Sequence, residues 1–170
     1  LAYVNQVGGQ DELVFDGGSF IVNRDGSVVA RAPFWEESIF VTRWTRHADG
    51  FACERGTHAP VPDRQESIYA AMVLGLRDYV GKNGFPGALL GLSGGIDSAV
   101  VSALAARTGL NTLLLEMPIR QKADQIDRAQ LHIENLQQRF ANVSGLRVDL
   151  TPTFEQFAAT VDVNEADFPA

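Results

Sequence analysis

The segment Ser93-Gly94-Gly95-Ile96-Asp97-Ser98 constrains the fold of this 170-residue chain more than any other feature. It follows the apolar run Ala88–Leu92 and precedes the apolar run Ala99–Leu104. A buried strand that turns at glycines into a helix collects backbone N–H groups in one concavity, to which the helix dipole adds positive charge. The segment therefore predicts a loop that binds pyrophosphate.

The side chains of this loop suit a metal–nucleotide complex. Ser93 and Ser98 can donate hydroxyl hydrogen bonds to phosphate oxygens. Asp97 cannot hold an anion directly and needs a cation, most simply Mg²⁺. The alternative is a tight strand-to-helix turn in which Asp97 or Ser98 serves as a helix cap. No Lys follows the glycines, and GxGxxG is absent as well, so the two common nucleotide loops are excluded.

Ser-Gly-Gly-x-Asp-Ser after a buried strand resembles the PP-loop of the ATP pyrophosphatases. These enzymes adenylylate a carboxylate or carbonyl oxygen, release pyrophosphate, and let a nitrogen or sulfur nucleophile displace AMP. The resemblance implies ATP and Mg²⁺ as ligands, with Asp97 holding the metal. Met117 and Gln121 follow the next expected strand, at the edge where parallel sheets bind ligands, and would face the adenine. The residues assigned to ATP in this way are Gly91, Leu92, Ser93, Gly94, Gly95, Ile96, Asp97, Ser98, Met117 and Gln121.

Two further segments narrow the resemblance to one family. Residues 77–87 are similar to the entry of the synthetase domain in glutamine-dependent NAD synthases, and residues 3–17 resemble the late part of the nitrilase-type glutaminase domain that precedes it. The enzymes of this family are carbon–nitrogen ligases. It implies that ATP activates the carboxylate of deamido-NAD as an adenylylated intermediate, and that ammonia from glutamine then displaces AMP to give NAD.

The resemblance also implies a domain order. We expect residues 1–45 to be the β-rich, C-terminal part of a nitrilase-like α/β glutaminase domain, residues 46–62 a linker, and residues 63–170 the truncated start of the synthetase domain. We expect that second part to be a doubly wound parallel α/β sheet of the adenine nucleotide alpha hydrolase type. Leu1 lies inside an apparent strand rather than at a start methionine, so we interpret the chain as an internal segment that is inactive alone.

The hydrophobic pattern predicts strands first and alternating helices and strands later. Asp25-Gly26 predicts a hairpin turn, because this pair readily adopts positive φ angles. A helix is expected to bury Ile68, Met72, Leu76, Tyr79 and Val80 on one face and to end before Pro86. Expected strands are 3–7, 13–15, 19–22, 28–30, 39–44, 89–92, 112–115 and 146–150; further helices are 97–108, 123–140 and 152–161.

Composition excludes some partners. A formal charge of −7 argues against nucleic acid or an acidic membrane, and no apolar run is long enough to span a bilayer. A single cysteine fits a reducing compartment, so we expect a cytoplasmic protein, and we expect it to form a homo-oligomer. Cys53 lies in the expected linker and lacks an oriented base, so we do not assign it as the glutaminase nucleophile. His47, His58 and His132 lack metal-ligand spacing and are expected in linker or surface positions; Asp124, Asp127 and Arg128 are expected on a solvated helix face.

Two other functions stay open at this point. Another PP-loop enzyme could amidate or thiolate a different acceptor, although the β-rich upstream segment argues against it. A non-catalytic module could use the same loop only to dock a nucleotide. No residue of the chain is assigned as a general acid or base.

Overall fold

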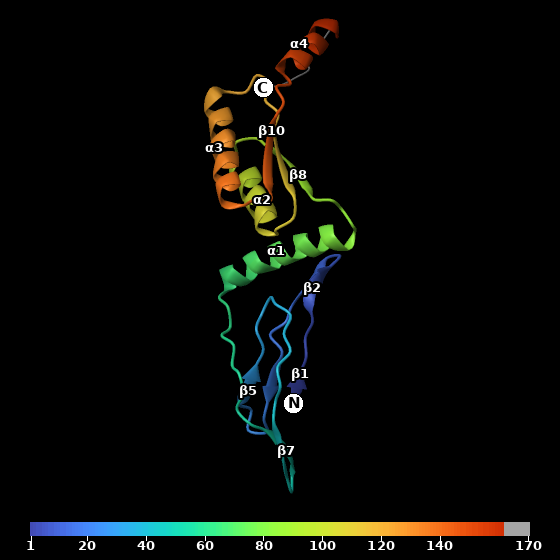
Figure 1. Cartoon of the computed structure of the whole chain (residues 1–170), viewed down its shortest axis with the longest axis vertical. Coiled ribbons are helices and arrows are strands. Elements are labelled where there is room, and N and C mark those ends of the chain that lie inside the picture. The colour runs from blue at the N-terminus through green and yellow to red at the C-terminus, as the bar shows by residue number, and fades with distance from the viewer. Residues whose placement is uncertain (162–170) are drawn as a thin grey trace. The chain divides into compact units, whose positions relative to one another are not determined.

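The computed structural model describes residues 1–161. The chain divides into two compact units, Leu1–Gly84 and Phe85–Ala170 (Figure 1). Between residues 1 and 161, no helix combines the length and the apolar composition that crossing a bilayer requires.

The first unit is built from short antiparallel strands. Its strands are β1 (Ala2–Tyr3), β2 (Val7–Gln10), β3 (Leu13–Asp16), β4 (Phe20–Val22), β5 (Val28–Arg31), β6 (Trp44–His47) and β7 (Gly50–Cys53). One sheet has the order β1-β4-β5, while β2 pairs with β3 and β6 pairs with β7. The predicted hairpin turn between β4 and β5 is confirmed, because Gly26 has a φ of +83° and the Asn23 N–H donates to the Ser27 carbonyl.

Helix α1 (Arg64–Lys82) packs on the β2–β3 hairpin of the same unit. Asp63 caps its N-terminus by accepting the Glu66 N–H at 2.8 Å. Glycines allow the helix to lie close to the strand: a Cβ on Gly9 would lie 2.9 Å from Gly75 Cα. The side chains that α1 buries are Leu74 and Val80.

Three expectations for this unit differ from the structure. Residues 39–43 form no strand, and Ile39 is fully exposed, because no neighbouring strand pairs with them. The β6–β7 hairpin, Trp44–Cys53, overlaps the first part of the expected linker, and Cys53 packs in the core with Ile21 and Ala30. On α1, Ile68, Met72 and Tyr79 of the expected apolar face are exposed, because the glycine contact with β2 turns a different face inward.

The second unit alternates strands and helices. Its elements are β8 (Ala88–Leu92), α2 (Ile96–Arg107), β9 (Thr112–Glu116), α3 (Ala123–Arg139), β10 (Val143–Arg147) and α4 (Thr151–Thr160). The strands are parallel in the order β10-β9-β8, so β9 is central. The register places Leu92, Glu116 and Arg147 side by side at the carboxyl edge of the sheet. This arrangement confirms the expected α/β class.

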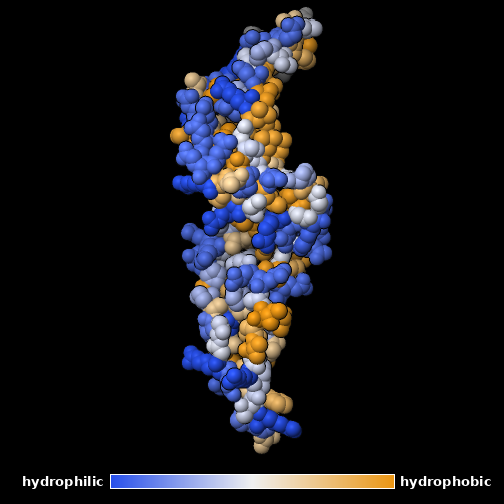
Figure 2. Space-filling model, viewed as in Figure 1, coloured by the Kyte–Doolittle hydropathy of each residue, from blue (hydrophilic) through white to orange (hydrophobic). Residues whose placement is uncertain are grey.

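Helices α2 and α3 cover one face of this sheet. Both contribute to a core around the fully buried Leu114, with Ala106 from α2 and Ile133 from α3. Figure 2 shows hydrophilic residues over the outer surface of α3, as expected for an amphipathic crossover helix. The two crossovers follow the strand order in one direction, which places both helices on the same face.

Strand β10 lies three residues earlier than the expected strand 146–150. Val143 pairs with Thr112 and is the buried residue of β10, whereas Leu146 is half exposed. Helix α3 passes so close to β10 that a Cβ on Gly145 would lie 2.5 Å from Ile133 Cγ2. This helix contact, which hydrophobic alternation cannot reveal, fixes the register of β10.

Candidate functional site

The glycine segment forms an open turn between β8 and α2. The strand ends at Leu92 and the helix begins at Ile96. Gly94 has a φ of +78°, a conformation that glycine adopts without steric cost. Gly95 is the N-cap of α2, and within residues 1–161 no side chain caps the first turn of the helix. The free N–H groups of that turn, together with the helix dipole, make this end of α2 suitable for an anion.

Two serine hydroxyls close the turn on itself. Ser98 Oγ donates to the Gly95 carbonyl at 3.0 Å, and Ser93 Oγ lies 3.3 Å from Ser98 Oγ. The Gly95 N–H donates to Ser93 Oγ at 3.3 Å. Most of these contacts are long for hydrogen bonds, so phosphate oxygens can compete for the same donors. The assignment of Ser93 and Ser98 to phosphate contacts stays a prediction.

Asp97 lies in the first turn of α2 and is exposed. In the part of the chain that the structure describes, no three His, Cys, Asp or Glu side chains cluster as a complete metal site. Mg²⁺ does not need such a cluster, because proteins often hold it with one or two carboxylates and the phosphates of the substrate. A single exposed carboxylate beside an anion-binding turn fits a metal ion that arrives with a nucleotide.

The end of β9 lies beside this turn. A Cβ on Gly91 would lie 3.4 Å from Met117 Cε, so the Met117 side chain reaches across to the end of β8. The structure thus brings Met117 to the strand edge that carries residues 91–98. Gln121 is exposed in the segment between β9 and α3. Its assignment to the adenine side stays a prediction.

Arg120 ties the segment around Gln121 to α4. Its backbone N–H donates to Thr151 Oγ1 at 3.2 Å, and its φ of +49° is unusual for a residue with a side chain. The guanidinium lies 5.5 Å from the centre of the Phe154 ring and 3.4 Å from a Glu155 carboxylate oxygen. These contacts attach the segment between β9 and α3 to α4.

Sequence reasoning missed the role of α3 beside the turn. A hollow of about 440 Å³ lies between the two, and its lining includes Gly94, Ser98, Arg128 and His132. Arg128 was expected on a solvated face; it is exposed, yet its Nε donates to the Gly94 carbonyl at 3.4 Å. His132 was expected at the surface, and that expectation is wrong: it is half-buried, 2.9 Å from Ser102 Oγ. Arg128 and His132 are four residues apart, which places them on the same face of α3, and this spacing is the sequence signal that could have paired them.

Glu116 is a second residue that sequence reasoning missed. It ends the central strand, its side chain is 4% exposed, and its Oε2 lies 3.8 Å from Arg147 Nε. Its Oε1 is buried and has no hydrogen-bond partner among the described residues. A buried carboxylate at this edge marks a polar position directly beside Leu92, the residue that precedes the glycine turn.

Comparisons with known proteins point to one family. A family model described as NAD synthase matches residues 68–169. The glutamine-dependent NAD(+) synthetase of Acinetobacter baylyi is 46% identical over 106 residues, which cover 62% of this chain and 19% of that protein. The glutamine-dependent NAD(+) synthetase of Thermotoga maritima is 31% identical in an alignment that covers 95% of this chain and 33% of that protein.

Solved structures give the same result. The glutamine-dependent NAD+ synthetase of Acinetobacter baumannii, in complex with adenosine diphosphate, matches 99% of this chain and 31% of its own with a TM-score of 0.82 and 31% identity. A glutamine-dependent NAD(+) synthetase from Cytophaga hutchinsonii matches 99% of this chain and 33% of its own at a TM-score of 0.72 and 17% identity, which supports the fold alone. The chain thus spans about a fifth to a third of the length of these relatives. Because the NAD synthase family model matches residues 68–169, which are more than half of the chain, the chain belongs to the NAD synthase family.

Proposed function

We propose that this chain contains the ATP-activating loop of a glutamine-dependent NAD synthetase. In this reaction deamido-NAD is amidated to NAD with ammonia from glutamine, and ATP is cleaved to AMP and pyrophosphate. The observation that carries the proposal is the turn at Gly94 and Gly95, which leaves the N-terminus of α2 uncapped beside Asp97. The names of the relatives support the acceptor and the nitrogen source.

The chemistry follows from where charge develops. A carboxylate oxygen of the nicotinic acid ring attacks the α-phosphorus of ATP, and the bond from that phosphorus to the bridging oxygen breaks. The loop N–H groups and the hydroxyls of Ser93 and Ser98 stabilise the negative charge on the departing pyrophosphate. Asp97 would hold Mg²⁺, which supplies charge neutralisation at the phosphate oxygens. Ammonia then attacks the activated acyl carbon and AMP leaves.

The strand edge supplies the rest of the nucleotide site. Met117, lying against Gly91, would contact one face of the adenine, and Gln121 would approach from the following segment. In this proposal the described residues bind and orient ATP and stabilise charge. None of them is assigned a proton transfer, so a pH optimum would report groups elsewhere in the protein.

We also propose a domain order for the whole protein. Residues 1–45 would end a nitrilase-like glutaminase domain, residues 46–62 would connect the domains, and residues 63–170 would begin the synthetase domain. The packing of α1 on β2 and β3 shows that the first helix after residue 62 belongs to the same compact unit as the preceding strands. Helix α1 would therefore be the first element of the synthetase domain and would be held in place by its packing on the strands of the preceding domain.

The test uses the full-length protein with ATP, Mg²⁺, deamido-NAD and either glutamine or an ammonium salt. We expect NAD, AMP and pyrophosphate in equal amounts with either nitrogen source. Formation of ADP and phosphate, or ATP binding without turnover, would contradict the proposal. A structure of an NMN synthetase from Francisella tularensis also matches, with a TM-score of 0.52 and 29% identity, so nicotinic acid mononucleotide is tested in parallel as the competing acceptor.

A further inference from the structure

Helix α3 packs against residues 93–98, the proposed phosphate loop. The Cα of Gly94 faces the first turn of α3 so closely that a Cβ there would clash with the carbonyl oxygen of Gln125. Glycine at this position is therefore required twice, once for its positive φ and once for this close approach. The loop and the start of α3 form one packed unit.

Arg128 makes the polar contact across this junction. Its Nε donates to the Gly94 carbonyl oxygen at 3.4 Å, and its Nη1 donates to Asp124 Oδ2 at 2.8 Å. Asp124 lies one turn earlier on α3, so the ion pair aligns the guanidinium along the helix surface toward the loop. The guanidinium can serve both partners at once because its N–H groups point in fixed, different directions.

The same face of α3 contacts α2 one turn further along. His132 Nε2 lies 3.1 Å from the Ala99 carbonyl oxygen and 2.9 Å from Ser102 Oγ. Ser102 is fully buried, so this contact lies in the interior of the helix pair. Arg128 is thus attached to a helix whose position against α2 is already fixed, and the contact with Gly94 is made from a rigid support.

We propose that Arg128 is a positioning residue for ATP, an inference that rests on the proposed function of the loop. A trans peptide is planar, so its carbonyl and its N–H point in opposite directions. Arg128 holds the Gly94 carbonyl toward α3 and thereby directs the Gly95 N–H to the opposite side, toward Ser93 Oγ. Without Arg128, the Gly94–Gly95 peptide is free to rotate, and the loop loses one prearranged donor for the phosphates.

The experiment compares variants of the full-length protein by steady-state kinetics with ammonium as the nitrogen source. Arg128→Ala removes the contact, and Asp124→Ala removes only the residue that aligns Arg128. Arg139→Ala, at the other end of α3, is the matched control for losing an arginine from this helix. Thermal unfolding of each variant tests whether the fold is retained, and the combined Arg128→Ala/Asp124→Ala variant completes a double-mutant cycle.

We expect Arg128→Ala to raise the KM for ATP about three- to tenfold, in line with one lost hydrogen bond, without changing the KM for deamido-NAD. Asp124→Ala should act in the same direction but less, and the combined variant should match Arg128→Ala. Tighter ATP binding in Asp124→Ala would mean that Arg128 reaches the phosphates directly, which would overturn the positioning role. The positioning role would also be overturned if Arg128→Ala and Arg139→Ala had the same KM for ATP. It would be overturned as well if Arg128→Ala raised the KM for ATP and the KM for deamido-NAD equally and lowered the melting temperature. If the unmodified protein makes no NAD, AMP and pyrophosphate, the proposed function itself fails.

Discussion

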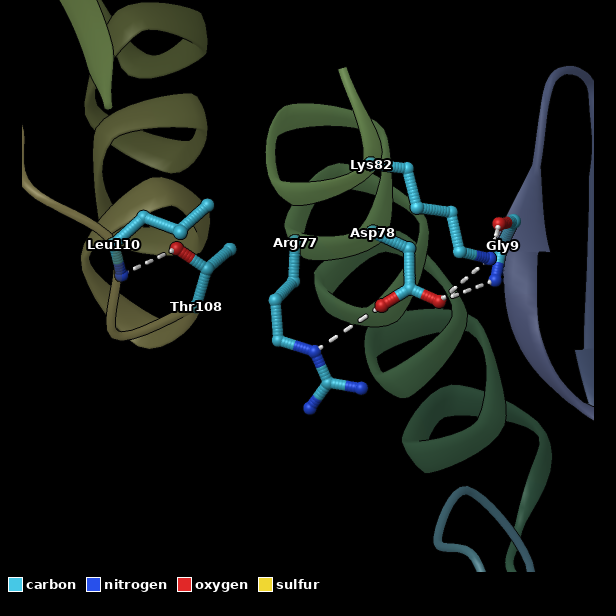
Figure 3. A network of polar contacts seen from close by, with 6 residues as sticks. All are labelled: Gly9, Arg77, Asp78, Lys82, Thr108 and Leu110. Carbon is cyan, nitrogen blue, oxygen red and sulfur yellow. Dashed lines mark hydrogen bonds and ion pairs between the residues drawn. The ribbon is translucent and has the colours of Figure 1, made fainter. Parts of the chain in front are cut away.

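Asp78 on α1 accepts a hydrogen bond from the backbone N–H of Gly9 on β2 at 2.8 Å, although 69 positions separate the two in sequence (Figure 3). Lys82, one turn later, donates to the Gly9 carbonyl at 2.5 Å and lies 3.4 Å from the Asp78 carboxylate. Both backbone groups of Gly9 are therefore bound by side chains of α1. This pairing, rather than apolar burial alone, fixes the helix on the hairpin.

The first prediction concerns this anchor. Asp78→Asn should destabilise the packing of α1 on β2 by about 1–3 kcal/mol, because a charged hydrogen-bond acceptor is lost from a position that is largely shielded from water. Hydrogen exchange measured by mass spectrometry on the full-length protein should show faster exchange in the peptide that contains residues 7–10. Asp49→Asn, which removes an exposed ion pair with Arg24, is the control and should leave that peptide unchanged. Unchanged protection in Asp78→Asn would contradict the prediction.

The second prediction is a pH dependence. Burial raises the pKa of Asp78, but the hydrogen bonds from Gly9, Arg77 and Lys82 outweigh it and hold the pKa below its ordinary value. A carboxyl with a lowered folded-state pKa stabilises the fold fully above its unfolded-state pKa of about 3.9, and this contribution is lost as the pH falls through the folded-state pKa. Exchange protection of residues 7–10 should therefore fall below about pH 4 in the unmodified protein, after correction for intrinsic exchange rates. In Asp78→Asn this additional fall should be absent.

The third prediction tests the metal ligand. Asp97→Asn should lower NAD synthesis by about a hundredfold or more, because the proposed Mg²⁺ site loses the carboxylate assigned to it in this chain. Glutamine hydrolysis in the same preparation should be largely retained. Asp127→Asn, an exposed carboxylate on α3, is the control for charge removal near the loop. Normal NAD formation by Asp97→Asn at ordinary Mg²⁺ concentration would exclude the metal assignment.

The fourth prediction separates backbone strain from steric clash. Gly94→Ala combines a positive φ with a clash against Gln125, and it should abolish ATP binding measured by calorimetry. Gly109→Ala has the same φ of +78° but open space around its Cβ. It should cost only about 1–2 kcal/mol of stability and leave ATP binding intact. Equal ATP affinity in the two variants would show that the turn at Gly94 does not contact the phosphates.

The fifth prediction concerns the single cysteine. Cys53 is buried in β7, and its backbone N–H and carbonyl both bind the Asn23 side chain, so it has a packing role in the first unit. Cys53→Ser should leave glutamate release from glutamine and NAD synthesis near the unmodified values, because a serine hydroxyl can replace the weak Sγ contact with the Glu54 carbonyl. A fall in glutamate release of about a hundredfold or more, comparable to losing a catalytic group, would contradict this and the proposed domain order.

Local chemistry was sufficient to predict several elements of the fold. Asp25-Gly26 predicts its hairpin because few residues other than glycine adopt a positive φ without strain. The strand that ends at Leu92 and the helix that follows Gly95 were predicted for a similar reason, since an apolar run, two glycines and a second apolar run leave few other local structures. In contrast, Ile39 and Val41 alternate like strand residues but lie exposed, because a strand needs a partner that alternation does not specify.

The sequence by itself determined the family, the α/β class and the glycine turn between β8 and α2, because each depends on residues that are neighbours in the chain. The tertiary structure decided the contacts between elements. The register of β10 depends on α3 passing over Gly145, and the attachment of α1 depends on the glycines at positions 9 and 75. The support of the loop depends on Arg128 reaching the Gly94 carbonyl from another helix. Such contacts join residues far apart in sequence, and only the packed arrangement of the helices and strands brings those residues within a few ångströms.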